Sequence, residues 1–143
     1  MRKLVLLVGA VMVMLVVAAG VAVAVTKTCG DNLPCTGTDN DDILHERKGS
    51  VKDRILGKDG SDRIEAVTFN ADRDRLEGGR KGDRLITADG DGRDSAQGGA
   101  GRDTCIVNQR DARSSCERLD IATTAEMNNL KAAVAPVYDN DGS

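Results

Sequence analysis

The chain has 143 residues, of which 40% are apolar, but many of these lie before residue 26. From residue 26 onward the chain has only one Phe, one Tyr and no Trp. These are too few large side chains for an ordinary two-layer core. The formal net charge is −3, and an acidic chain is a poor partner for nucleic acid. Bound metal or disulfides are therefore expected to provide part of the stability.

The N-terminal residues 1–24 have the pattern of a secretory signal peptide. Two basic residues follow Met1, and the uncharged stretch from Leu4 to Val25 contains Ala22-Val23-Ala24, an A-x-A cleavage pattern. We expect cleavage after Ala24 and a secreted, extracellular mature protein. Because the apolar stretch is also long enough to cross a bilayer, a membrane anchor over residues 4–25 at the cell surface is the alternative.

The four cysteines are Cys29, Cys35, Cys105 and Cys116. An even number in an exported chain indicates disulfides, and of the three possible connectivities we expect the sequential one, 29–35 and 105–116, which closes short loops. Zinc is the competing use of four cysteines. The spacings C-x5-C and C-x10-C and the presence of a single histidine, His45, do not match a zinc module.

An Asp-x-apolar pattern recurs seven times between the cysteine pairs. Its aspartates are Asp42, Asp53, Asp62, Asp74, Asp83, Asp94 and Asp103. Their spacings are 11, 9, 12, 9, 11 and 9, so alternate copies are 20, 21 and 20 residues apart. This predicts stacked coils of about 20 residues, each made of two half-turns, with the extra residues always on the same edge.

A glycine-bearing turn precedes every second aspartate. The turns cover residues 37–42, 57–62, 78–83 and 98–103, and the last one, Gly98-Gly99-Ala100-Gly101-Arg102-Asp103, fits G-G-x-G-x-D in full. Over residues 37–106 the sequence resembles the RTX, or hemolysin-type calcium-binding, repeat G-G-x-G-x-D-x-U-x, in which U is a large apolar residue. The resemblance implies an all-β fold, a right-handed parallel β-roll of about three to four coils.

The resemblance also implies calcium as the cofactor, with ions between turns of successive coils on one edge. Calcium prefers six to eight oxygen ligands, and glycine lets a turn point its carbonyl groups inward. The expected ligands are Asp42, Asp62, Asp83 and Asp103, with the turn residues Gly37, Asp39, Gly57, Asp59, Gly60, Gly78, Gly79, Gly98, Gly99 and Gly101. Weaker binding is expected at Asp53, Asp74 and Asp94, where most of the glycines are missing. Asp83→Ala should therefore weaken calcium-induced folding more than Asp74→Ala.

The segments around the roll are expected to close it. Residues 25–36 and 107–122 are predicted to be N-terminal and C-terminal caps, and residues 123–143 a short helix with a disordered tail. Thr123 and Glu126 form a capping-box pattern at the start of that helix, which should end before Pro136.

Strand alternation predicts which side chains point into the roll. The inward set is Leu44, Ile55, Ile64, Leu76, Leu85, Ala96 and Cys105. The neighbouring residues, which include the repeated arginines Arg54 and Arg63, Glu65 and His45, are expected to face solvent.

Three other interpretations compete with a calcium-loaded roll. Disorder does not explain the Asp period, although it is expected without calcium. Asp89-x-Asp91 lacks the remaining ligands of an EF-hand. A lone exposed His45 is a poor general base, so no enzyme activity and no small-molecule substrate are expected. The sequence thus predicts a secreted calcium-binding protein that folds outside the cell, with an anchored surface adhesion or spacer protein as the alternative.

Overall fold

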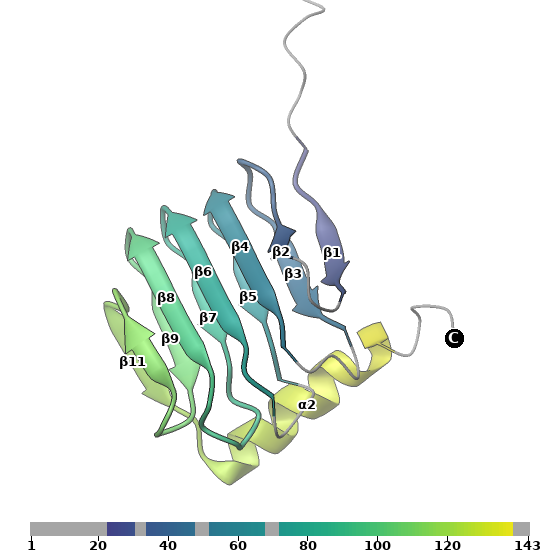
Figure 1. Ribbon diagram of the computed structural model, residues 1–143, viewed down its shortest axis with the longest axis vertical. Helices are drawn as coiled ribbons and strands as arrows, with labels where there is room; N and C mark the ends of the chain where they lie inside the picture. The colour runs from purple at the N-terminus through teal and green to yellow at the C-terminus, as the bar shows by residue number, and fades with distance from the viewer. Residues whose placement is uncertain (1–22, 31–33, 48–51, 68–71, 139–143) are drawn as a thin grey trace, which may run out of the picture.

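The chain forms a parallel β-solenoid of about four turns in a computed structural model that describes residues 23–30, 34–47, 52–67 and 72–138 (Figure 1). Nearly all of the expected signal peptide, residues 1–22, and the expected tail from residue 139 lie outside the described residues. Within the described part, no helix is long and apolar enough to cross a membrane.

Two parallel sheets form the walls of the solenoid. The six-stranded sheet has the order β1 (Thr26–Cys29), β3 (Ile43–Glu46), β5 (Arg63–Glu65), β7 (Arg84–Ile86), β9 (Thr104–Val107) and β11 (Arg118–Ile121). The five-stranded sheet has the order β10 (Ala112–Ser114), β8 (Ser95–Ala100), β6 (Arg75–Arg80), β4 (Arg54–Asp59) and β2 (Pro34–Thr36). Successive strands of the chain thus alternate between the two walls.

The pairing register confirms the predicted coil of about 20 residues. Arg54 pairs with Arg75 and Arg75 with Ser95 in one sheet, while Ile64 pairs with Leu85 in the other. The parallel pairing extends beyond residues 37–106 at both ends, because β1 and β2 precede this range and β10 and β11 follow it. The segments expected to be caps therefore contribute further strands to the solenoid.

A single narrow core runs between the sheets. All seven residues predicted to point inward are completely buried there. The predicted disulfides Cys29–Cys35 and Cys105–Cys116 both form, and their sulfur-bearing side chains belong to the two ends of this core. They stabilise the outer coils, where the row of branched aliphatic residues stops, and disulfides are typical of an oxidising, extracellular setting.

The two edges of the solenoid differ in the length of their connections. Four turns, at residues 37–42, 60–62, 81–83 and 101–103, lead from the five-stranded to the six-stranded sheet; we call this side the short-turn edge. The connections at residues 47–53, 66–74 and 87–94 are longer, and together with the four-residue segment 108–111 they lead back and form the long-loop edge. The insertions inferred from the unequal spacing of the aspartates all lie on the long-loop edge.

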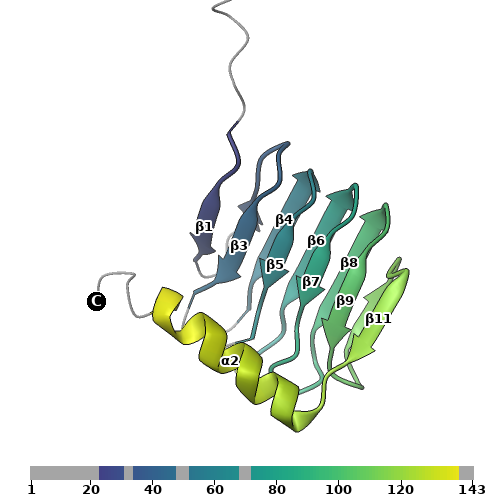
Figure 2. The ribbon, with the colours of Figure 1, turned by 180° about the vertical axis from the view of Figure 1, so that it is seen from behind.

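Helix α2 (Thr124–Tyr138) crosses the coils instead of covering the open end of the core (Figures 1 and 2). Met127 and Leu130 pack against Ile86 and Ile106 on the outer face of the six-stranded sheet. The predicted capping box is present, with Thr123 N–H donating to Glu126 Oε2 at 2.7 Å and Glu126 N–H donating to Thr123 Oγ1 at 3.3 Å.

The end predicted for this helix is wrong, since α2 continues through Pro136 to Tyr138. Proline has no backbone N–H, so at position 136 it removes one hydrogen bond, and this bond lies in the last turn of the helix.

The predicted exposure of His45 and Glu65 is also wrong. Both side chains are buried, with His45 6% and Glu65 1% exposed. They lie in the same row as Ile86 and Ile106, because His45 pairs with Glu65, Glu65 with Ile86 and Ile86 with Ile106. Helix α2 packs across this row, which alternation along a strand could not reveal.

Candidate metal centre

Glycine stacking defines the short-turn edge. A Cβ added to Gly57 would lie 2.2 Å from Asp62 Oδ2 and 2.4 Å from the carbonyl oxygen of Gly78, and Gly37, Gly78 and Gly98 are equally crowded. At the next position the backbone is left-handed, with φ of 125° at Gly79 and 112° at Gly99, a conformation that glycine adopts without strain. These contacts explain why the turns carry glycine before the aspartate.

The aspartates of this edge form a hydrogen-bonded ladder. Asp42 N–H donates to Asp62 Oδ1, Asp62 N–H to Asp83 Oδ1 and Asp83 N–H to Asp103 Oδ1, each at 2.8 Å. Glu117 continues the ladder by accepting from Asp103 N–H. One oxygen of each aspartate therefore satisfies the backbone of the preceding coil, which is a structural role that needs no ion.

Part of the carboxylate charge on this edge is not neutralised. Burial, opposed by the ladder hydrogen bond and reinforced by repulsion from neighbouring aspartates, raises the pKa of Asp62 to about 6 and that of Asp83 to about 7. Asp42 behaves differently, because hydrogen bonds from Thr38 and Val25 outweigh its burial and lower its pKa. Within the described residues, none of the groups of three converging metal-binding side chains includes an aspartate of this edge.

Two other residues predicted as ligands on this edge lie apart from the ladder. Asp39 is exposed, and Asp59 is directed toward Arg80, with 3.5 Å between Asp59 Oδ2 and the guanidinium. The short-turn edge thus has one of the predicted stronger ligands in each coil. The additional carboxylates expected from the sequence, Asp39 and Asp59, do not join them.

The long-loop edge has its own aspartate ladder. Asp53 N–H donates to Asp74 Oδ1 at 2.7 Å, Asp74 N–H to Asp94 Oδ1 at 2.8 Å and Asp94 N–H to Asp111 Oδ1 at 3.3 Å. The predicted weaker ligands therefore stack as regularly as the stronger ones. Asp111 extends their ladder by a residue that the repeat did not include.

Additional carboxylates surround this second ladder. Three groups of acidic side chains have ligand oxygens within 4.8 Å of one another: Glu46 with Asp72 and Asp74, Asp72 with Asp89 and Asp91, and Asp91 with Asp94 and Asp111. Asp72 belongs to the first two groups and Asp91 to the last two. The groups therefore form a continuous acidic row along the edge, and adjacent groups share one carboxylate.

Several oxygens in this row are buried without a hydrogen-bond partner. Asp72 is 4% exposed and both of its carboxylate oxygens are unpartnered. The same is true of one oxygen each in Asp89, Asp91 and Asp94. A buried carboxylate that has neither a donor nor a counter-charge is costly, so these atoms are suited to face a cation.

The pKa values in the row reflect the same lack of compensation. Burial, followed by repulsion from Asp74, raises the pKa of Asp72 to about 7. Burial raises the pKa of Asp94 to about 8 and that of Asp89 to about 6, and in both cases repulsion between neighbouring carboxylates adds to this effect. In the folded chain, burial and mutual repulsion therefore favour the protonated form of these carboxylates.

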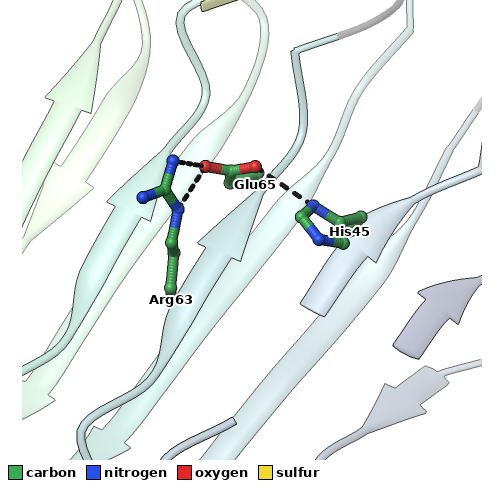
Figure 3. Close-up of polar contacts among 3 residues, drawn as sticks. All are labelled: His45, Arg63 and Glu65. Carbon is green, nitrogen blue, oxygen red and sulfur yellow. Dashed lines mark hydrogen bonds and ion pairs between the residues drawn. The ribbon is translucent and has the colours of Figure 1, made fainter. Parts of the chain in front are cut away.

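Glu65 shows how a buried carboxylate is compensated elsewhere in the same molecule (Figure 3). Its Oε2 lies 3.0 Å from His45 Nδ1, and Arg63 donates to its Oε1. Burial alone would raise the pKa of Glu65, but these hydrogen bonds and the charge of Arg63 outweigh it and lower the pKa. The contrast with Asp72, whose two oxygens are unpartnered, shows that burial is compensated by hydrogen bonds and charge at Glu65 and is not compensated in this way at Asp72.

Polar contacts hold the loops that carry the row. Asp111 Oδ2 accepts from Thr87 Oγ1 at 2.9 Å and from Asn108 N–H at 2.7 Å. Asn108 Oδ1 in turn accepts from Gly90 N–H at 3.0 Å. These contacts join consecutive coils and hold the loops that carry the carboxylates in place.

Sequence reasoning missed five residues of this row. They are Glu46, Asp72, Asp89, Asp91 and Asp111. A signal was present, because the half-turns that lack the full glycine pattern gain aspartates two to five positions before the ladder residue, as in Asp72-Arg73-Asp74 and Asp89-Gly90-Asp91. These aspartates lie in the insertions, which have no equivalent position in the repeat, so the repeat pattern did not identify them as ligands.

Comparison with protein-family models, with curated proteins and with solved structures found no match.

Proposed function

We propose that this chain is a secreted calcium-binding protein whose solenoid is stabilised by cations on the long-loop edge. The carrying observation is Asp72, a buried carboxylate with two unpartnered oxygens that lies between two groups of further carboxylates. The resemblance of the short turns to the RTX repeat supports calcium as the ion. Our proposal moves the main sites from those turns to the opposite edge.

The ligand chemistry favours calcium over other metals. The groups offer only carboxylate oxygens, without histidine or cysteine, and hard cations such as calcium and magnesium select oxygen ligands. Calcium accepts more ligands and a less regular geometry than magnesium does. A row of irregular loops with shared carboxylates is therefore better suited to calcium.

Cation binding should be coupled to stability. Without an ion, the folded chain holds like charges close together in a buried place, whereas the unfolded chain separates them. An ion that binds only the folded state shifts the equilibrium toward it. Extracellular calcium modules typically bind at about 10⁻⁴ to 10⁻³ M, so the chain would gain this stability after export, once residues 1–24 have been removed.

The short-turn edge has a different role in this proposal. Its aspartates each use one oxygen to bind the backbone of the preceding coil, so we assign them mainly to coil stacking. The alternative is that calcium binds between the glycine turns, where Asp62, Asp83 and Asp103 each keep one unpartnered oxygen.

Thermal unfolding of the disulfide-bonded protein with chelator and with millimolar calcium tests the proposal, using Asp72→Asn and Asp83→Asn as matched variants. In chelator, Asp72→Asn should be more stable than the unmodified protein by about 1 kcal/mol, because it removes an uncompensated buried charge. In calcium the order should reverse, since the variant loses a shared ligand. Asp83→Asn should keep most of the calcium response, because the amide oxygen can still accept from Asp62.

The opposite result would place the ions on the short-turn edge. If Asp83→Asn abolished the response and Asp72→Asn preserved it, the assignment of the edge would be wrong. If millimolar calcium left the unfolding temperature of the unmodified protein unchanged, the proposed function itself would fail.

A further inference from the structure

Asn108 joins helix α2 to the loops that carry the acidic row. The residue is buried, with 8% exposed. Its Nδ2 donates to Met127 Sδ of α2 at 2.9 Å, and its Oδ1 accepts from Gly90 N–H at 3.0 Å. Its backbone N–H donates to Asp111 Oδ2 at 2.7 Å. One residue therefore contacts both the helix and two parts of the long-loop edge.

The residues on either side of Gly90 supply two carboxylates of the row. Asp89 Oδ1 accepts from Asp91 N–H at 3.0 Å, whereas the Oδ2 atoms of both aspartates are buried without a hydrogen-bond partner. Asp91 also belongs to two of the three acidic groups. The position of Gly90 in the loop thus affects where two of the unpartnered oxygens lie.

Helix α2 packs against this same loop. Ala88 is completely buried in the apolar cluster that also contains Met127 and Leu130. Asp89 is the next residue in the chain. A Cβ built on Gly90 would lie 3.9 Å from Met127 Sδ, so the sulfur lies beside the loop as well as beside the amide of the asparagine.

We propose that Asn108 is a positioning residue through which docking of α2 strengthens cation binding in the acidic row. The helix holds Asn108 through Met127, and Asn108 in turn holds the loop 87–94. Because the docked helix keeps the unpartnered oxygens in place, less conformational freedom is lost when an ion binds. This inference rests on the proposed function, since it concerns the same cations.

The coupling must act in both directions. If docking of α2 increases the affinity for a cation, a bound cation favours docking by the same factor. Loss of the contact between Asn108 and Met127 should therefore destabilise the protein more in calcium than in chelator. A contact with a structural role alone would cost the same stability under both conditions.

Lys131 of α2 acts on the same loop with the opposite sign. Burial and repulsion from Asp91 raise the pKa of Asp89 to about 6, and the positive charge of Lys131 opposes this rise. A charge that is felt at Asp89 also repels a cation bound there. Removal of this charge should therefore strengthen calcium binding, whereas removal of the sulfur contact should weaken it.

Calcium titration calorimetry of the disulfide-bonded protein tests the proposal with Met127→Leu and Met127→Gln as a matched pair. Leucine fills a similar space but cannot accept from Asn108 Nδ2, whereas the amide oxygen of glutamine can. Met127→Leu should weaken the apparent calcium affinity about fivefold. Met127→Gln, and the control Asn128→Ala on an exposed position of the same helix, should change it less than about twofold.

Urea unfolding measures the reciprocal effect. At one saturating calcium concentration, the stability loss of Met127→Leu should exceed its loss in chelator by about 1 kcal/mol, which is the fivefold change in affinity converted to free energy. Circular dichroism in calcium confirms that each variant is folded. Equal losses with and without calcium would show that the contact is structural only and would overturn the proposal.

Lys131→Gln separates positioning from a general loosening of α2. It should strengthen calcium binding about twofold, so two variants of one helix should move the affinity in opposite directions. Weaker binding in both Lys131→Gln and Met127→Leu would overturn the role of Asn108.

Failure of the coupling differs from failure of the proposed function. If the unmodified protein bound calcium and Met127→Leu bound it equally well, the coupling would be wrong and the proposed function would stand. If the unmodified protein bound no calcium, the proposed function would fail and the coupling with it.

Discussion

At the scale of single residues, each glycine turn is determined by contacts with its own aspartate and with the next coil. The first glycine of the turn faces the carboxylate that ends it, and the carbonyl oxygen of the next turn lies on its other side. A side chain at this place would push apart two coils. The glycines are therefore required for coil stacking whether or not an ion binds beside them.

Gly57→Ala should destabilise the protein strongly. The added methyl group would meet Asp62 Oδ2 at 2.2 Å and Gly78 O at 2.4 Å, so the backbone must shift, at a cost of about 2 kcal/mol or more. Urea unfolding measures the effect. Gly30→Ala is the control, because nothing lies within 4 Å of its added Cβ, and it should change the stability by less than about 0.5 kcal/mol. Similar effects of the two substitutions would contradict the stacking contact.

At the scale of elements, α2 decides what the outer face of the six-stranded sheet contacts. A sheet face that is open to water usually carries polar residues. On this outer face, however, Ile86 and Ile106 pack against Met127 and Leu130 of α2. The capping box fixes where α2 begins. Helix α2 is thus a lateral brace that crosses several coils, and it packs against Ile86 and Ile106 of the row that also contains His45 and Glu65.

Leu130→Ala should lower the stability of the whole solenoid, because α2 and the sheet share one apolar cluster. For a half-buried leucine the expected loss is about 1.5 kcal/mol. The control is Ala125→Ser, on an exposed position of the same helix, with an expected change below about 0.5 kcal/mol. Urea unfolding gives the global stability, and hydrogen exchange shows whether α2 opens alone. If only the α2 amides exchanged faster, with the unfolding midpoint unchanged, the helix would not brace the coils.

At the scale of the whole molecule, the apolar core stabilises the fold, whereas repulsion between the stacked carboxylates destabilises it. The core is one side chain wide and ends in disulfides, while the two edges stack carboxylates at the distance between strands. Coil stacking therefore brings together like charges that the unfolded chain would separate. The raised pKa values of these carboxylates couple the stability of the folded protein to pH.

The stability of the metal-free protein should fall as the pH rises from 5 to 8. An unfolded aspartate has a pKa near 3.9, whereas the folded values are about 7 for Asp72 and about 8 for Asp94. In this window the folded state binds more protons than the unfolded state does, so raising the pH favours unfolding. Asp42 and Glu65, whose pKa values are lowered, act in the opposite direction only near and below pH 4.

Urea unfolding at pH 5 and pH 8 in chelator measures this loss, which should be on the order of 2 kcal/mol. The same pair of measurements in saturating calcium is the control. Calcium should remove most of the difference, because the bound cation takes the place of the protons. Greater stability at pH 8 than at pH 5 in chelator would show that the carboxylates are compensated in another way.

The sequence by itself determined the period, the inward-pointing residues, the parallel stacking and the disulfide pairs. These features follow from local rules: side chains alternate along a strand, glycine marks a tight turn, and equal spacing brings equivalent residues into register. Leu44, Ile64 and Leu85 could therefore be assigned to the core before any contact was known.

Only the tertiary structure decided which edge gathers the carboxylates and which outer face is covered. Asp72, Asp89 and Asp91 lie in insertions outside the repeat register, so their proximity depends on the path of two separate loops. His45 and Glu65 lie in the same row as Ile86 and Ile106, against which a helix about 60 to 80 residues later in the chain packs. Both outcomes depend on contacts between distant segments, which the period of a repeat does not specify.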